Sequence, residues 1–254
     1  ADRVQEMLED RGLKIIVGES AQEFVGQDRV TGVSVAGETI PADLVVVATG
    51  VKANVELAKE AGIDLGQTGG IKTGPRMETS VEDVYAAGDC VQSINMITKR
   101  PMLCQLGTAA VKQAKVAGTN AAGGYTIFPG VLGSAVTKLF DIEVGVTGLN
   151  QFFANRAGMQ TVAGALSSKT KADYYPGGLP IRIKIVVEKE SHRLVGGQII
   201  GGEAVTQRIN ALSFAIQKQM TVQELAKADT AYAPPVNETW EPMIQAAEIA
   251  IRRL

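Results

Sequence analysis

The sequence predicts an α/β segment followed by an α+β domain in which helices cover an antiparallel sheet. Two observations lead to this prediction. Helical and apolar strand patterns alternate up to about residue 124, and beyond it a group of strands precedes a group of helices. Alternation is typical of α/β folds, whereas strands grouped ahead of helices indicate an α+β fold. A chain of 254 residues has room for about two domains.

The composition argues against several classes of protein. Lys and Arg number 25 against 27 Asp and Glu, so there is no basic excess to neutralise nucleic-acid phosphates. No apolar run reaches the roughly 18 residues of a membrane-spanning helix, and no secretory signal is evident. Two cysteines form no disulfide framework. We therefore expect a cytoplasmic protein without nucleic-acid or membrane partners.

Residues 1–50 open with an amphipathic helix that ends at Gly12, a residue suited to a helix C-cap. Three strand patterns follow, at residues 13–18, 29–37 and 38–50. The last contains the apolar run from Leu44 to Ala48, which predicts a strand buried on both faces. Because the chain begins within a helix, without methionine or an earlier strand, we expect it to be part of a longer protein.

Residues 51–124 contain two helical patterns on either side of a short strand. The first covers residues 54–66, with Asn54 as the expected N-cap. The strand lies at residues 84–87 and leads into Gly88-Asp89. The second helix, at 105–124, is rich in Ala and Gly, which permits close packing against a sheet or a ligand.

Residues 125–254 carry the α+β pattern. Strands are predicted at 142–149, 160–168, 181–190 and 193–202. The last two form an antiparallel hairpin around the turn "KESHR". Helices are predicted at 203–219, 221–228 and 238–254.

Asp89 is the first candidate for chemistry. An acidic residue that follows Gly88 at the tip of an apolar strand is poorly placed for a core. Its carboxylate could accept hydrogen bonds from hydroxyls of a ligand, because ligands of open α/β sheets bind outside the carboxyl ends of strands. The alternative for an isolated Gly-Asp is an ordinary turn or helix cap.

Several motifs together resemble one family. They are "TSVEDVYAAGDC", "ADLVVVATG", "LGTAAVKQAKVAGTNAAGG", "DYYPGG" and "TAYAPP", in this family's order and spacing. The chain resembles the C-terminal half of the FAD-dependent pyridine nucleotide–disulfide oxidoreductases, in the branch of NADH oxidases and coenzyme A disulfide reductases. The resemblance implies three parts: the end of an NAD(P)H-binding domain at 1–50, the end of a FAD-binding domain at 51–124, and an α+β interface domain at 125–254.

The resemblance also implies roles for single residues. Asp89 would accept a hydrogen bond from a ribityl hydroxyl of FAD, with Gly88 close to the same chain. Backbone N–H groups at a helix N-terminus would face the pyrimidine edge of the flavin, and these belong to Leu106, Gly107, Thr108 and Ala109. Thr49 and Gly50 would border the nicotinamide nucleotide.

Three tyrosines stand in proline-anchored segments, namely Tyr174, Tyr175 and Tyr232. The resemblance implies that they reach the substrate site of the partner subunit. The alternative is a set of aromatics at the rim of a dimer interface. Relatives often carry a histidine shortly before the tyrosine pair. This chain has Lys169 and Lys171 there, which could bind coenzyme A phosphates as point charges.

Other expected parts are absent from this sequence. Neither glycine-rich dinucleotide fingerprint nor the redox cysteine of the family is present, so no catalytic residue is assigned to this chain. Cys90 and Cys104 are more typical of packed thiols than of a replacement. His192, the only histidine, lies in a charged turn where we expect a solvated side chain. We therefore expect no metal site.

The parent protein is thus interpreted as a FAD-dependent NAD(P)H oxidoreductase, either an NADH oxidase or a small-thiol or coenzyme A disulfide reductase. Hydride would pass from NAD(P)H to FAD and on to O2 or a disulfide. NADH and NADPH stay open as alternatives. We expect the chain to form a homodimer through 125–254 and to be inactive without a separate N-terminal half. The alternative is a non-catalytic assembly module that pairs with that half.

Overall fold

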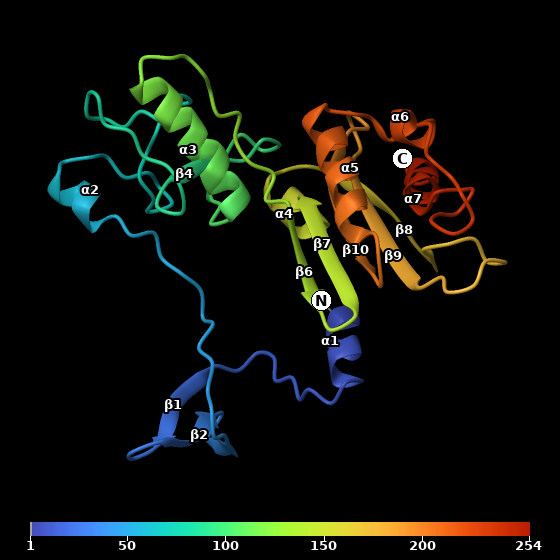
Figure 1. Ribbon diagram of the computed structural model, residues 1–254, viewed down its shortest axis with the longest axis horizontal. Coiled ribbons are helices and arrows are strands. Elements are labelled where there is room, and N and C mark those ends of the chain that lie inside the picture. Colours follow the sequence, from blue (N-terminus) through green and yellow to red (C-terminus); the bar gives the residue numbers. More distant parts are fainter. Residues whose placement is uncertain (1) are drawn as a thin grey trace. The chain divides into compact units, whose positions relative to one another are not determined.

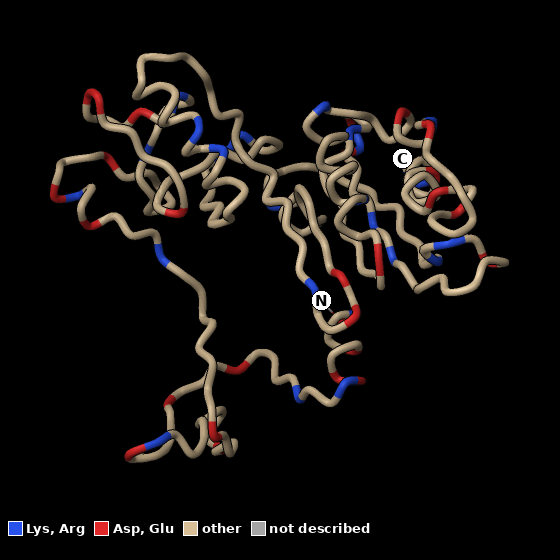
Figure 2. Tube along the Cα trace, viewed as in Figure 1, with Lys and Arg blue, Asp and Glu red and all other residues tan. Residues whose placement is uncertain are grey.

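The computed structural model describes residues 2–254. The chain divides into two compact units, of which the first ends at Val51 and the second runs from Lys52 to Leu254. Within the described residues, no helix has the length and hydropathy that crossing a membrane requires. Basic and acidic residues are interspersed along the trace (Figure 2).

The first unit contains one helix and a small antiparallel sheet in the order β1-β2-β3 (Figure 1). Its elements are α1 (Asp2–Glu9), β1 (Ala21–Gly26), β2 (Val30–Val35) and β3 (Glu38–Pro41). Ala36 and Gly37 join β2 to β3, with φ of 51° and 83°. Two central residues with positive φ are typical of the tight turns that fit the twist of a hairpin.

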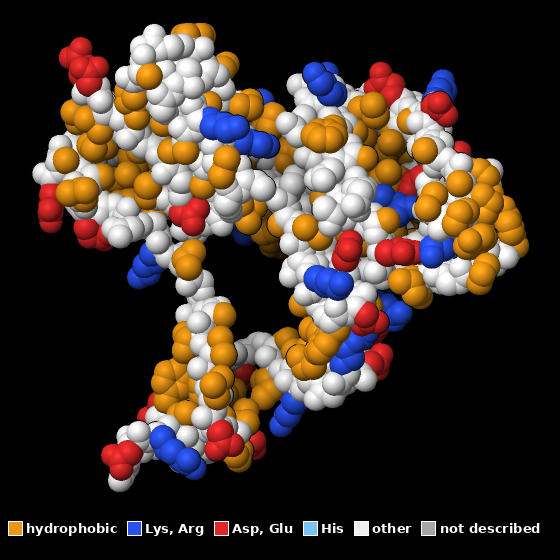
Figure 3. Space-filling view, viewed as in Figure 1, with side chains coloured by type: hydrophobic (Ala, Val, Ile, Leu, Met, Phe, Trp, Pro, Cys, Tyr) orange, Lys and Arg blue, Asp and Glu red, His pale blue; other side chains and the backbone are white. Residues whose placement is uncertain are grey.

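One predicted strand of this unit is absent from the structure, and another is shortened. Residues 13–18 pair with no strand among the described residues. Of the predicted strand at 38–50 only Glu38–Pro41 is a strand, and its apolar run at 44–48 is unpaired. Leu44, Val46 and Val47 are 76%, 79% and 61% exposed, and Figure 3 shows hydrophobic side chains along this part of the chain. A buried strand needs neighbours on both edges and cover on both faces. The sequence pattern shows that this run is apolar, but it does not show whether neighbouring strands are present to pair with it.

The second unit begins with a loop-rich region that ends in a long helix. Its elements are α2 (Glu56–Glu60), β4 (Gln92–Ile94), β5 (Pro101–Leu103) and α3 (Gly107–Ala121). The predicted helix at 105–124 is confirmed, whereas the N-cap of α2 is Val55 and not Asn54. The predicted strand at 84–87 is reduced to a single bridge between Glu78 and Tyr85. A small core packs beneath α3, formed by buried Val55, Ala58, Ile71, Met77, Val91 and Val116.

The rest of this unit is a five-stranded antiparallel sheet in the order β6-β7-β10-β9-β8 (Figure 1). The strands are β6 (Ala135–Leu139), β7 (Ile142–Gly148), β8 (Thr161–Lys169), β9 (Pro180–Glu188) and β10 (Leu194–Gly201). The helices are α4 (Gln151–Arg156), α5 (Val205–Gln217), α6 (Val222–Ala226) and α7 (Pro242–Ile251). The predicted hairpin of β9 and β10 is confirmed, as is the α+β fold class.

Helices α5 and α7 cover the same face of this sheet. Gly197 of β10 lies beneath Leu212 of α5, and it pairs with Ile185, which pairs in turn with Gly164. Gly164 lies beneath α7. Because directly paired residues project from the same face, one apolar layer runs under both helices. Up to Ile185, the strand β9 shows the expected alternation, with Ile181, Ile183 and Ile185 buried in this core and Arg182 exposed.

Candidate functional site

Gly88 and Asp89 form a turn that is tied to α3. The N–H of Gly88 donates to Oε1 of Gln113 at 2.8 Å, and Gln113 is buried and donates in turn to Ser93 Oγ at 2.9 Å. Gly88 has φ of +95°, a conformation that favours glycine. A Cβ placed there would meet only the Cβ of Ala110, at 3.9 Å. The Asp89 side chain is exposed, so a ligand can approach both residues.

The N-terminus of α3 has the properties of an anion-binding helix end. Its N-cap is Leu106, whose extended backbone offers no capping side chain, and the first turn holds no acidic residue. The N–H groups of Ala109 and Ala110 donate to the carbonyl of Leu106. Gly107 and Thr108 are exposed, and within residues 2–254 no acceptor is found for their N–H groups. Free N–H groups and the helix dipole together favour a negative charge at this end.

The structure brings the predicted residues of the flavin site together. Gln105, just before α3, donates from Nε2 to the carbonyl oxygen of Asp89 at 3.5 Å. The negative charge of Asp89 also acts on Cys104. The exposed turn at Gly88-Asp89 and the free N-terminus of α3 therefore lie beside each other in the second unit. This juxtaposition joins two segments that the sequence separates by about 17 residues.

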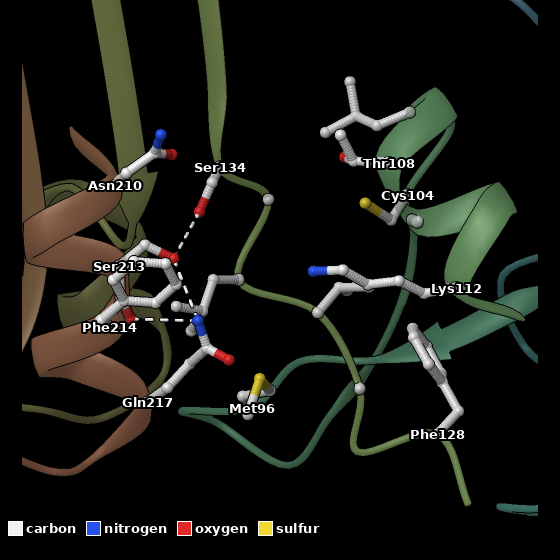
Figure 4. Close-up of a pocket in the computed structure, with 16 residues that line it drawn as sticks. Met96, Cys104, Thr108, Lys112, Phe128, Ser134, Asn210, Ser213, Phe214 and Gln217 are labelled. Carbon is white, nitrogen blue, oxygen red and sulfur yellow. Dashed lines mark hydrogen bonds between the residues drawn. The ribbon is translucent and has the colours of Figure 1, made fainter. Parts of the chain in front are cut away.

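A cavity of about 280 Å³ opens beside this helix end (Figure 4). Its walls come from the start of α3, the connection from Phe128 to Ser134, and one side of α5. Lys112 of α3 projects into it. On the opposite wall, the Oγ atoms of Ser134 and Ser213 are 3.2 Å apart, and Nε2 of Gln217 donates to Ser213 Oγ at 3.1 Å. The cavity is therefore polar on the α5 side and basic on the α3 side.

Thr49 and Gly50, the residues expected to border the nicotinamide nucleotide, belong to the first unit. Both are exposed in an irregular segment, and Gly50 has φ of +99°. Their role stays a prediction from the sequence resemblance.

The three tyrosines lie on two loops, and two of them are in direct contact. The hydroxyl groups of Tyr174 and Tyr232 are 2.5 Å apart, although 74% of Tyr174 and 41% of Tyr232 are exposed. The hydrogen bond with Tyr232 raises the pKa of Tyr174 above its usual range, and the charge of Glu238 adds to this effect. Tyr175 is anchored through its backbone N–H to the carbonyl of Ala172 at 2.8 Å.

The two cysteines differ in exposure, since Cys90 is half-buried and Cys104 is buried. Both are free, and the Sγ of Cys90 lies 3.6 Å from the carbonyl oxygen of Ala87. Cys104 is buried, and this burial, with a smaller contribution from Asp89, raises the pKa of its thiol. A raised pKa lowers the fraction of nucleophilic thiolate near neutral pH.

Alkylation rates test this environment. At pH 8 we expect iodoacetamide to modify Cys104 in the folded chain at least about 10-fold more slowly than in urea, because the thiolate is scarce and shielded. Asp89→Asn is expected to raise the folded-state rate by removing the nearby negative charge. Peptide mass spectrometry over a time course gives both rates. Equal rates in the folded and unfolded chain would contradict the assignment.

His192 differs from the expectation of a solvated side chain. It is half-buried, and its Nδ1 lies 2.9 Å from Nε2 of Gln223 at the start of α6. Its carbonyl accepts the N–H of Val222 at 2.8 Å. The residue therefore links the β9–β10 turn to α6. Among the described residues, no cluster of three or more His, Cys, Asp or Glu could hold a metal ion.

One buried ion pair was not predicted from the sequence. Arg208 of α5 and Glu241 before α7 are 6% and 3% exposed, and Nε of Arg208 donates to Oε1 of Glu241 at 2.6 Å. The signal was the position of Arg208 on the helix, since it lies between Val205 and Leu212 on the stripe that faces the sheet. A charge within an apolar stripe calls for a buried partner.

Two family models match this chain. The model described as pyridine nucleotide-disulphide oxidoreductase matches residues 1–114, and the model of the dimerisation domain of the same enzymes matches residues 134–244. An NADH oxidase of Methanocaldococcus jannaschii is 44% identical over 254 residues, which is 100% of this chain and 56% of that protein. An NAD(P)H sulfur oxidoreductase (CoA-dependent) of Pyrococcus furiosus is 41% identical over 248 residues, 98% of this chain and 56% of that protein.

A solved structure agrees with these matches. The NAD-dependent persulfide reductase from A. fulgidus is 39% identical and superposes with a TM-score of 0.96, over 100% of this chain and 47% of that one. Fold and matched models thus define an oxidoreductase domain followed by a dimerisation domain. The chain belongs to the pyridine nucleotide-disulphide oxidoreductase family, which confirms the resemblance. It spans 56% of the length of the two relatives named above.

Proposed function

We propose that this chain supplies the C-terminal part of a FAD-dependent NAD(P)H oxidoreductase. The observation that carries the proposal is the juxtaposition of the exposed Gly88-Asp89 turn with the uncapped N-terminus of α3. The turn offers the Asp89 carboxylate and a backbone at Gly88 that a ligand can approach closely, and the helix end offers free N–H groups. A cofactor with a hydroxylated chain and a ring that gains negative charge on reduction fits both.

In this proposal, each of these residues would bind a different part of FAD. Asp89 would accept hydrogen bonds from the ribityl hydroxyls, and Gly88 would allow that chain close to the backbone. The N–H groups around Gly107 and Thr108 would hold the pyrimidine edge of the ring, where the helix dipole favours negative charge. When bound, FAD would supply the chemistry of accepting a hydride from NAD(P)H and passing the electrons on. Thr49 and Gly50 are proposed to border the nicotinamide.

The proposed acceptor is O2 or a small disulfide, because relatives bear the names NADH oxidase and NAD(P)H sulfur oxidoreductase (CoA-dependent). Residues 125–254 are proposed to form a homodimer, which the match to a dimerisation domain supports. Tyr174, Tyr175 and Tyr232 would reach the substrate site of the other subunit. The two free cysteines fit a cytoplasmic setting.

A chimera tests the flavin site. Residues 1–254 are joined to the part of the M. jannaschii NADH oxidase that they do not match, and purified chimera is expected to be yellow and to oxidise NADH. Asp89→Ala is expected to lower the affinity for FAD by about 10- to 100-fold, because hydrogen bonds to a charged group are lost. Flavin absorbance after dialysis and fluorescence titration with FAD measure the change.

The controls separate the alternatives. Glu82→Ala removes an exposed carboxylate near the same turn and should leave FAD affinity unchanged. Residues 1–254 alone are expected to be colourless, dimeric and inactive. A chimera that assembles but neither binds FAD nor oxidises NADH would favour the assembly-module alternative. An Asp89→Ala chimera with undiminished FAD affinity would refute the role of Asp89.

A further inference from the structure

Two loops carry the tyrosines, and both are held by residues at the start of α5. The first loop runs from Thr170 to Leu179 and carries Tyr174. The second lies between α6 and α7 and carries Tyr232. The hydroxyl contact between these tyrosines joins residues 58 positions apart. Because both rings are substantially exposed, packing around them does not fix the contact, and the loops themselves must be anchored.

Glu203, two residues before α5, anchors the first loop at its neck. Thr170 is 1% exposed, and its Oγ1 donates to Oε1 of Glu203 at 2.6 Å. The same Oγ1 accepts the N–H of Leu179 at 3.0 Å, while the N–H of Thr170 donates to the carbonyl of Leu179 at 2.9 Å. Nζ of Lys171 lies 3.7 Å from Oε1 of Glu203. The two ends of the loop are thereby closed against one carboxylate.

Arg208, in the first turn of α5, anchors the second loop. Its Nε donates to Oε1 of buried Glu241, and its Nη2 donates to Oδ1 of Asn237 at 2.9 Å. Nδ2 of Asn237 donates at 3.1 Å to the carbonyl of Ala231, the residue next to Tyr232. The planar guanidinium can hold both partners at once because its donors form a rigid fork.

The backbone at the start of α5 separates Glu203, which binds the first loop, from Arg208, which binds the second. Ala204, the N-cap between them, has φ of +59°, and its carbonyl accepts from Nη1 of Arg208 at 3.4 Å. We propose that Glu203 and Arg208 are positioning residues that together set the contact between Tyr174 and Tyr232. The inference rests on the proposed function, which assigns these tyrosines to a substrate site. It adds the residues that hold the two tyrosine hydroxyl groups in contact.

Ultraviolet titration of tyrosinate tests the proposal in the full chain. The chain has five tyrosines, and an ordinary tyrosine titrates near pH 10. The hydrogen bond with Tyr232 raises the pKa of Tyr174 because the Tyr174 hydroxyl keeps its proton as the donor, and the charge of Glu238 makes a smaller contribution. The nearby Lys169 is paired with Asp173 at 2.7 Å. In the wild-type protein, one titration step should therefore occur at higher pH than for an ordinary tyrosine. This late step is the deprotonation of Tyr174, and Tyr232→Phe should shift it to lower pH.

Three variants break the anchors without touching the tyrosines. Arg208→Lys keeps the charge but cannot reach both Glu241 and Asn237, whereas Asn237→Ala leaves the buried ion pair in place. Glu203→Ala releases Thr170, and Glu203→Gln keeps an acceptor without the charge. We expect the first three to shift the late step as Tyr232→Phe does. Glu203→Gln and the exposed control Arg182→Lys should retain it.

Fluorescence of Trp240, the only tryptophan, establishes that each variant is folded. If Arg208→Lys unfolds, Asn237→Ala and Glu203→Ala decide the result. A late step that persists in these folded variants overturns the proposal. The titration needs neither flavin nor turnover, so its outcome is independent of the proposed activity. If the late step is lost and turnover of the chimera is unchanged, the anchoring stands and the substrate role of the tyrosines fails.

Discussion

Replacing Gly164 with alanine is expected to destabilise the C-terminal domain by roughly 3 kcal/mol, because the site is already filled by backbone. A Cβ on Gly164 would lie 1.8 Å from the carbonyl oxygen of Ala246 and 2.6 Å from the amide nitrogen of Ala250. No rotamer change relieves a clash with backbone atoms, so α7 must move away from β8. Such a shift opens the core formed by Ala246, Ala247 and Ala250, which are fully buried.

Urea unfolding followed by Trp240 fluorescence measures this effect, since that residue lies just before α7. Gly178→Ala is the matched control. A Cβ there meets its nearest neighbour at an ordinary 3.4 Å, and the expected change is within about 0.5 kcal/mol. If the two variants have equal unfolding midpoints, the conclusion that the α7 backbone packs directly on Gly164 of β8 is wrong.

Glu241→Ala is expected to cost about 3–5 kcal/mol, because it leaves the Arg208 guanidinium buried without its counter-charge. The substitution also removes the cap of α7, since Oε2 of Glu241 accepts the N–H of Met243. Arg208 keeps Asn237 and the carbonyl of Ala204 as partners. Neither of these carries a negative charge.

The double variant Arg208→Met/Glu241→Leu tests the physical reason. Replacing both members of a buried ion pair with apolar residues of similar size is often close to neutral. We therefore expect the double variant to be more stable than Glu241→Ala in the same urea experiment, although the cap stays lost. A double variant less stable than the single one would show that the pair stabilises the fold by more than mutual neutralisation.

Much of the C-terminal domain could be predicted from the sequence because its patterns are local. Ile181, Ile183 and Ile185 alternate with exposed or partly exposed residues, and the helices that follow carry apolar stripes. The apolar run at 44–48 shows the limit of this reasoning. Its side chains fit a buried strand, but pairing depends on neighbours that a local pattern does not report.

The candidate site was predictable to a similar extent. The motif order indicated Asp89 and the helix that begins at Gly107, and the structure places them side by side. The contact of Tyr174 with Tyr232 depends on two loops folding against one helix, so no spacing in the sequence reveals it. Arg208 was visible as a charge among apolar neighbours, but its partner lies 33 residues away.

The exposed run at 44–48 also bears on how the chain behaves at high concentration. Leu44, Val46 and Val47 lie in a segment of high β-propensity whose backbone pairs with no strand among the described residues. An unpaired apolar strand is a template on which the same segment of another molecule can add. Concentrated preparations should therefore be prone to self-association through intermolecular β-pairing, and a charge placed at Val46 would act as a gatekeeper against it.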